Sequence, residues 1–198
     1  MARTPNPLRK PELIEQILEF LLDKSLSSVT FRSLATGLDV STFTLVYHFG
    51  TRAELIREVV QAISSRAGIV EEINSDAEAT LDTFVTGLEL SWQWSIQPRN
   101  RQLQRLEFEA GMLESLHPDE LSFMRALYKR WVDIGVVAMV KFGMDEADAE
   151  AEARVIVNAF HGLQYDLVLN DDVPAATRSF ERALQQHRAR IEYFMSGR

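Results

Sequence analysis

The sequence predicts an all-α protein with a small N-terminal head and a larger helical body. Over almost the whole chain, apolar residues recur at intervals of three and four, which is the spacing of one helix face. No extended stretch shows the alternation of a strand, and no internal repeat is present. With 46% hydrophobic and 25% charged residues, the 198-residue chain has enough apolar material for a core.

The head begins with three expected helices. Pro11 suits the first turn of a helix that ends near Ser25. A second helix is expected at 31–38 and a third at 42–48, because hydroxyl residues stand at both starts as N-caps. These caps are Thr30 and Ser41, and Asp39 lies between the two helices as a turn residue that tolerates the left-handed backbone.

The body is expected to contain longer helices. Gly50 interrupts the chain, and Thr51 with Glu54 then forms a capping box that opens the first long helix. The predicted ranges are 52–73, 77–96, 100–115, a helix from Pro118 to near Gly143, 145–169 and 174–195.

Charge is spread unevenly along the chain, whose formal net charge is -8. Residues 1–66 hold 8 Lys and Arg against 7 Asp and Glu, and the remaining residues hold 13 against 22. Residues 1–10 carry Arg3, Arg9 and Lys10 without an acid, so we expect a basic flexible arm there. A solvated tail without a partner is the alternative.

Composition also limits the compartment and the chemistry. The chain has no cysteine, which excludes disulfides and thiolate chemistry. No apolar run approaches the ~20 residues that span a bilayer, so no membrane partner is expected. The N-terminus MARTPNPLRK lacks the apolar core of a signal peptide, and the expected location is the cytoplasm.

Two short helices joined by a tight turn, after a helix that braces them, form a helix-turn-helix unit. Val40, Leu45 and Phe49 fall at roughly helical spacing and are expected to face the bracing helix. Hydroxyl, aromatic and imidazole groups on the opposite side can donate to phosphates or base edges of DNA. These outward candidates are Ser41, Thr42, Thr44, Tyr47 and His48. Arg52 follows at a helix start, where the dipole favours a phosphate.

At these positions, residues 12–56 resemble the DNA-binding head of the TetR-family transcriptional regulators. The matching residues are Thr30, Leu34-Ala35, Val40-Ser41, Thr44-Leu45, Tyr47-His48-Phe49 and Thr51-Arg52-Ala53-Glu54-Leu55. The resemblance implies a helix-turn-helix DNA-binding domain at 11–56 and a helical ligand-binding and dimerisation domain at 57–198. It also implies a regulator, usually a repressor, that binds a palindromic double-stranded DNA operator as a homodimer and is released by a small-molecule effector.

The expected DNA-contacting residues follow from this resemblance and from the outward side of the unit. They are Thr30, Arg32, Ser41, Thr42, Phe43, Thr44, Tyr47, His48, Thr51 and Arg52. The chain departs from the family pattern at Asp39, usually Gly, at Phe43, often a small residue, and at Val46, often Tyr. Phe43 is expected either to touch a thymine methyl group or to pack within the head.

The last two helices carry apolar stripes that a two-fold four-helix bundle would bury. The predicted dimer interface comprises Ile156, Phe160, His161, Leu163, Leu167, Phe180, Leu184 and Ile191. The alternative is that both stripes are internal core.

The middle helices carry aromatic and Met side chains suited to a ligand pocket. The candidates are Phe84, Leu88, Trp92, Phe108, Met112, Met124, Tyr128 and Trp131, and ordinary core packing is the alternative. Glu89, Glu107 or Glu109 would favour a cationic or hydroxylated ligand if one faced inward, and otherwise lies on a solvated face.

No enzyme, metal site or cofactor is predicted. The sequence contains no nucleophile elbow, P-loop or dinucleotide fingerprint. Glu114 and His117 form one Glu-x-x-His pair, whereas a di-iron bundle needs two such pairs and two further Glu. The alternative function is a helical adaptor that has kept the fold without binding DNA.

Overall fold

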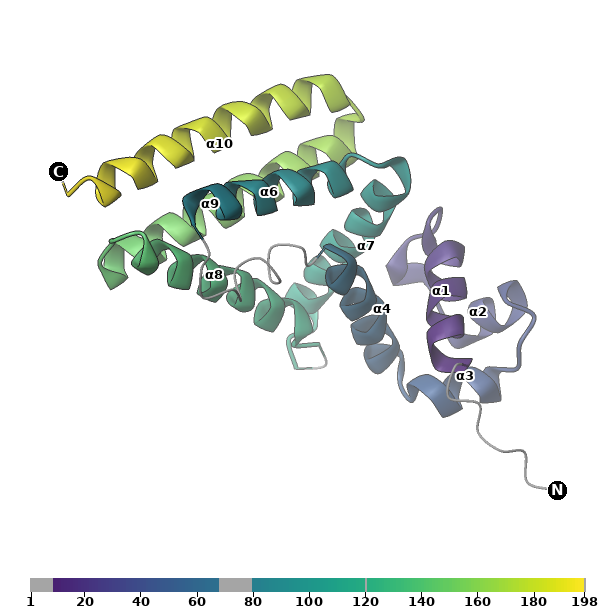
Figure 1. Ribbon diagram of the computed structural model, residues 1–198. Coiled ribbons are helices and arrows are strands. Elements are labelled where there is room, and N and C mark those ends of the chain that lie inside the picture. Colours follow the sequence, from purple (N-terminus) through teal and green to yellow (C-terminus); the bar gives the residue numbers. More distant parts are fainter. Residues whose placement is uncertain (1–8, 68–79, 120, 198) are drawn as a thin grey trace. The chain divides into compact units, whose positions relative to one another are not determined.

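The computed structural model describes residues 9–67, 80–119 and 121–197, and every regular element in these ranges is a helix (Figure 1). This confirms the predicted all-α class. The predicted end of the fourth helix at 73 and most of the predicted basic arm lie outside the described residues. Arg9 and Lys10, assigned to the arm, instead begin the first helix, where Lys10 Nζ donates to Glu58 Oε1 over 2.9 Å.

The chain forms two compact units. Of the described residues, those within 9–65 and 105–123 form the N-terminal unit, and those within 66–104 and 124–197 form the C-terminal unit. The first unit therefore extends beyond the predicted head at 11–56, because residues 57–65 and 105–119 also belong to it.

In the N-terminal unit, α1 (Arg9–Leu21) buries one apolar stripe. Its buried residues are Leu13, Ile14, Ile17, Leu18 and Leu21. The helix ends at Leu21 rather than near Ser25, and a short 3-10 helix, η1 (Leu26–Ser28), follows. Leu26, the first residue of η1, is buried like the apolar residues of α1, so apolar spacing alone did not mark the end of α1.

The helix-turn-helix forms as predicted from its caps. Thr30 begins α2 (Phe31–Gly37), and its Oγ1 accepts the Ser33 N–H over 3.1 Å. Asp39 adopts the left-handed backbone with φ 51°, and the Val40 N–H closes the turn on the Ala35 carbonyl.

The next two helices also start at the predicted caps. Ser41 Oγ accepts the Thr44 N–H over 3.0 Å at the start of α3 (Thr42–Phe49). Gly50 has φ 67°, a backbone region that L side chains rarely adopt, and it ends α3. Thr51 and Glu54 then form the reciprocal bonds of a capping box at α4 (Arg52–Ala67).

Part of α7 (Pro98–Leu116) fixes the chain that leaves α1. Arg105 donates to the carbonyl groups of Leu21, Leu22 and Lys24. Glu109 Oε2 accepts the Leu26 N–H over 2.6 Å. Glu109, one of the three carboxylates considered for a ligand pocket, thus holds the backbone of its own unit.

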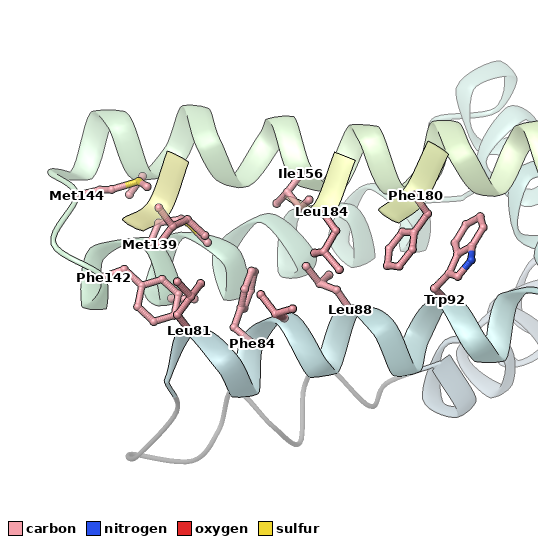
Figure 2. Packing of buried hydrophobic residues seen from close by; sticks show 14 of the residues in the cluster. Leu81, Phe84, Leu88, Trp92, Met139, Phe142, Met144, Ile156, Phe180 and Leu184 are labelled. Atoms are coloured by element: carbon pink, nitrogen blue, oxygen red, sulfur yellow. The ribbon is translucent and has the colours of Figure 1, made fainter. Parts of the chain in front are cut away.

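Among its described residues, the C-terminal unit contains α6 (Leu81–Ser95), the first residues of α7, α8 (Phe123–Lys141), α9 (Glu146–Asn170) and α10 (Val173–Met195). α9 and α10 pack against each other along a helical hairpin. Trp92 lies in the shared core, stacked on Phe180 at a ring-centroid distance of 4.7 Å (Figure 2). Where Gly135 of α8 faces Ala153 of α9, an added Cβ would lie only 2.9 Å from the Ala153 Cβ, so the two helices approach closely.

The predicted start of α8 at Pro118 was wrong. Pro118 lies in a turn closed by the Leu121 N–H on the His117 carbonyl, and the helix begins at Phe123. Proline suits both the first turn of a helix and the second position of a turn, so its presence did not distinguish the two.

Most of the predicted dimer interface is also corrected by the structure. Five of the eight residues are buried inside the single C-terminal unit: Ile156, Leu167, Phe180, Leu184 and Ile191. These five side chains are already covered, so they have almost no surface left to bury in a dimer. Phe160 and Leu163 are half-buried and pack against the same core. These residues of α9 and α10 therefore belong to the internal core, which was the alternative to a dimer interface.

Candidate nucleic-acid interface

One side of α3 is anchored in the N-terminal unit and the other is exposed. Leu45 and Phe49 are buried, as predicted, while Val40 is half-buried. Ser41, Thr42 and Tyr47 are exposed, and Thr44 and His48 are half-buried. The short helix is thus held by two apolar anchors and presents its remaining side to solvent.

Phe43 is 77% exposed, which excludes the alternative that it packs within the head. Its ring stacks on the exposed ring of Tyr47 at a centroid distance of 6.5 Å. Val46, which is absent from the residues predicted to contact DNA, is 48% exposed. Its position three residues after Phe43 could have indicated that both lie on one face.

The hydroxyls of the interface already stabilise the helix starts. Those of Thr30 and Ser41 cap α2 and α3, and Thr51 Oγ1 accepts the Glu54 N–H over 3.2 Å. The hydrogen bonds that Thr51 donates lower the pKa of the Glu54 carboxyl group. All three threonine and serine residues are exposed, so their predicted DNA contacts would add to a capping role.

Arg52 does not project as the predicted phosphate ligand. Its Nε donates to the Val29 carbonyl over 2.9 Å, and its Nη2 donates to the carbonyls of Leu26 and Ser27 over 2.9 and 3.1 Å. The guanidinium group therefore holds η1 against the start of α4. Sequence reasoning missed this role because the acceptors are backbone atoms far earlier in the chain, which no side-chain pattern reveals.

Two other basic side chains lie on the surface of this unit. Arg32 on α2 and Arg57 on α4 are exposed, and the charge of Arg57 contributes to lowering the pKa of the nearby Glu54. By contrast, Lys10 is paired with Glu58. Arg32 and Arg57 are thus the better placed cations for contacts with phosphates.

The eight predicted pocket residues are divided between the two units. Phe108 and Met112 belong to the N-terminal unit, where Met112 is exposed. The other six belong to the C-terminal unit: Phe84, Leu88 and Trp92 are buried in the core, and Met124, Tyr128 and Trp131 are half-buried on α8.

An open groove of about 530 Å³ lies between α6 and α10. Trp92 is the member of the predicted pocket that lines it, together with Leu90, Phe180 and Thr177. The Trp92 Nε1–H donates to Thr177 Oγ1 over 3.1 Å. Glu89 also borders the groove and is exposed.

Polar groups are buried in the C-terminal unit at positions that no sequence pattern marked. Gln164 of α9 donates from Nε2 to Ser95 Oγ of α6 over 2.9 Å. Within the described residues, Gln164 Oε1 and Ser91 Oγ are buried without a hydrogen-bond partner. His161, predicted at the dimer interface, is half-buried beside Trp131, with the ring centroids 4.7 Å apart.

Burial shifts three titratable groups. Desolvation raises the pKa of Glu107, in the N-terminal unit, to about 7. It lowers the pKa of His161, whose Nδ1–H donates to the Val157 carbonyl over 2.8 Å. It also lowers the pKa of His187, although Glu152 Oε1 lies 3.2 Å from His187 Nδ1 and partly opposes this shift.

The described helices and acidic or imidazole side chains bear on membrane and metal binding. Among the helices of residues 9–67, 80–119 and 121–197, none combines the length and apolar character needed to cross a bilayer. In the same ranges, no three His, Asp or Glu side chains are grouped so that they could hold a metal ion.

The chain was compared with known proteins by sequence and by structure. No family model and no curated protein sequence matches it. A TetR transcriptional regulator from Legionella pneumophila matches in structure at 15% identity and a TM-score of 0.68, with 98% of each chain covered.

Two solved complexes are also similar. A TetR variant from Acinetobacter baumannii in complex with minocycline shares 17% identity at a TM-score of 0.61, over 94% of this chain and 97% of that one. BioQ with its natural double-stranded DNA operator shares 20% identity at a TM-score of 0.54, over 92% and 96%. These likenesses extend over both units, and the chain therefore has the fold of the TetR-family transcriptional regulators.

Proposed function

We propose that the protein is a DNA-binding transcriptional regulator, a repressor that binds a palindromic operator as a homodimer and is released by a small-molecule effector. The exposed face of α3 carries this proposal, because a capped helix-turn-helix holds it rigidly outward. The similar structure with a bound DNA operator supports the same use of this fold.

In this proposal α3 enters the major groove and the surrounding groups contact the backbone. Exposed hydroxyls of Thr42 and Thr51 and the cations of Arg32 and Arg57 are available for phosphates. The net charge of -8 opposes DNA binding at long range, so these local groups must supply the attraction.

The dimer would form through a different face of α9 from the predicted one. Six exposed residues follow one another at intervals of four and three, and therefore line one side of the helix: Ala151, Val155, Asn158, Gly162, Tyr165 and Leu169. A Cβ added at Gly162 would meet nothing within 4 Å, so a second helix could approach closely there. A two-fold arrangement would place two heads about one DNA turn (~34 Å) apart.

An effector would act by binding one arrangement of the heads better than the other. The half-buried Tyr128 and Trp131 on α8 remain candidates for its site, and the similar structure with minocycline supports a small-molecule partner.

We expect the protein to retain one palindromic site from a pool of genomic duplexes. If six or more phosphates are contacted, raising the salt from about 50 to 200 mM should lower the affinity on the order of 10³-fold, because counterion release becomes less favourable as the salt concentration rises. Binding and sequencing at the two salt concentrations checks this. Retention of no duplex at either concentration would favour the adaptor function instead.

Val155→Arg should shift the protein towards monomer and raise the dimer dissociation constant at least about tenfold, equal to ~1.4 kcal/mol. The reason is that an Arg would place unpaired charge in the α9 face. Val137→Arg on α8 is the matched control, because Val137 is 66% exposed and Val155 is 59% exposed. Analytical ultracentrifugation measures the change, and equal behaviour of the two variants would contradict this dimer face.

A further inference from the structure

The sequence of α3, TFTLVYHF, contains no Lys, Arg, Asn, Gln, Asp or Glu. These are the side chains that form bidentate or charge-assisted hydrogen bonds with base edges in the major groove. The helix that the proposed function places in the groove therefore lacks the usual means of reading guanine or adenine.

Apolar and aromatic groups occupy the exposed face instead. Phe43, Val46 and Tyr47 stand at positions i, i+3 and i+4, so their side chains share one face, and all three are exposed. Phe43 is the second residue of α3, in the N-terminal part of a recognition helix that contacts base edges. Its stacking on Tyr47, with an angle of 24° between the rings, limits the positions available to the Phe43 ring.

Among the groups displayed in the major groove, the thymine 5-methyl is the one that an apolar side chain can recognise. We propose that Phe43 and Val46 read thymine methyl groups, and that the operator half-site carries thymines where they dock. The inference rests on the proposed function, and it names the base that the α3 face selects.

Deoxyuridine tests this directly, because it pairs like thymidine but lacks the 5-methyl group. Each thymidine of the retained operator is replaced in turn, and the dissociation constant is measured by fluorescence anisotropy at fixed salt. We expect the affinity to fall about tenfold or more at one or two positions per half-site. This is comparable to the cost of one mismatched base pair. Other thymidines in the same duplex are the internal control.

Two protein variants connect the effect to named side chains. Phe43→Ala and Val46→Ala should weaken binding to the thymidine operator and become insensitive to deoxyuridine at the position each one reads. Leu90→Ala, which removes an exposed apolar side chain from α6, should leave both measurements unchanged. Circular dichroism should show that all three variants remain folded, because the mutated side chains are exposed.

The outcomes separate this inference from the proposed function. If no duplex is retained, the proposed function fails, and the methyl readout fails with it. If an operator is retained but binds equally well with deoxyuridine throughout, only the methyl readout is overturned. If Phe43→Ala and Val46→Ala bind the operator as tightly as the unmodified protein, the face serves another partner and the inference is likewise overturned.

Discussion

Trp92→Ala is expected to lower the free energy of unfolding of the C-terminal unit by about 3–5 kcal/mol. Trp92 is completely buried, stacks on Phe180 and meets Phe160 edge to face at 6.1 Å. Its Nε1–H also donates to Thr177. Truncation would leave a large cavity and would remove the hydrogen bond to Thr177, and the neighbouring helices can relax only partly.

Urea denaturation followed by circular dichroism measures this change. Leu90→Ala on the same helix is the control, since its side chain is 42% exposed and should cost less than about 1 kcal/mol. A Trp92→Ala loss as small as that of Leu90→Ala would show that Trp92 does not hold α6 against α10.

Arg52→Ala is expected to destabilise the N-terminal unit by about 2–3 kcal/mol. The variant loses three hydrogen bonds from a charged donor to the carbonyls of Leu26, Ser27 and Val29. Partial exposure lets water replace some of them, so the loss is smaller than for three fully buried bonds. Arg52→Lys should recover only part of the stability, because an ammonium group cannot span the same carbonyls with a planar fork.

Arg57→Ala distinguishes stability from DNA binding. Arg52 and Arg57 both lie on α4, but the Arg57 side chain is exposed. Its replacement by Ala should therefore change the free energy of unfolding by less than about 0.5 kcal/mol. Differential scanning fluorimetry and operator binding are measured on both variants. If Arg52→Ala weakened DNA binding without lowering stability, Arg52 would act as the phosphate ligand that the sequence suggested.

Local signals predicted the helix-turn-helix well. Thr30, Ser41 and the Thr51–Glu54 pair were identified as caps, and each makes the expected bonds within four residues. Asp39 was expected to adopt the left-handed backbone and does so. These features depend on side chains close in sequence to the groups they satisfy, so the order of residues was sufficient to predict them.

Hydrophobic periodicity predicted the apolar stripes of the helices, but not which other helices bury them. Ile156, Leu184 and Ile191 were assigned to a dimer interface, yet they are covered by other helices of the same unit. An apolar stripe has the same spacing whether its partner belongs to the same chain or to a second copy. The exposed stripe of α9 contains Asn158 and Gly162. Because it is less apolar than the buried stripe, the hydrophobic pattern did not identify it as a candidate interface.

The sequence by itself determined the all-α class, the helix-turn-helix and the residues that cap it, because these follow from backbone hydrogen bonding over a few positions. Only the tertiary structure decided that Arg52 holds η1, that Phe43 is exposed and that α9 turns a different face outward. Each of these depends on which distant groups occupy the space around a side chain, and that occupancy is set by the packing of whole helices.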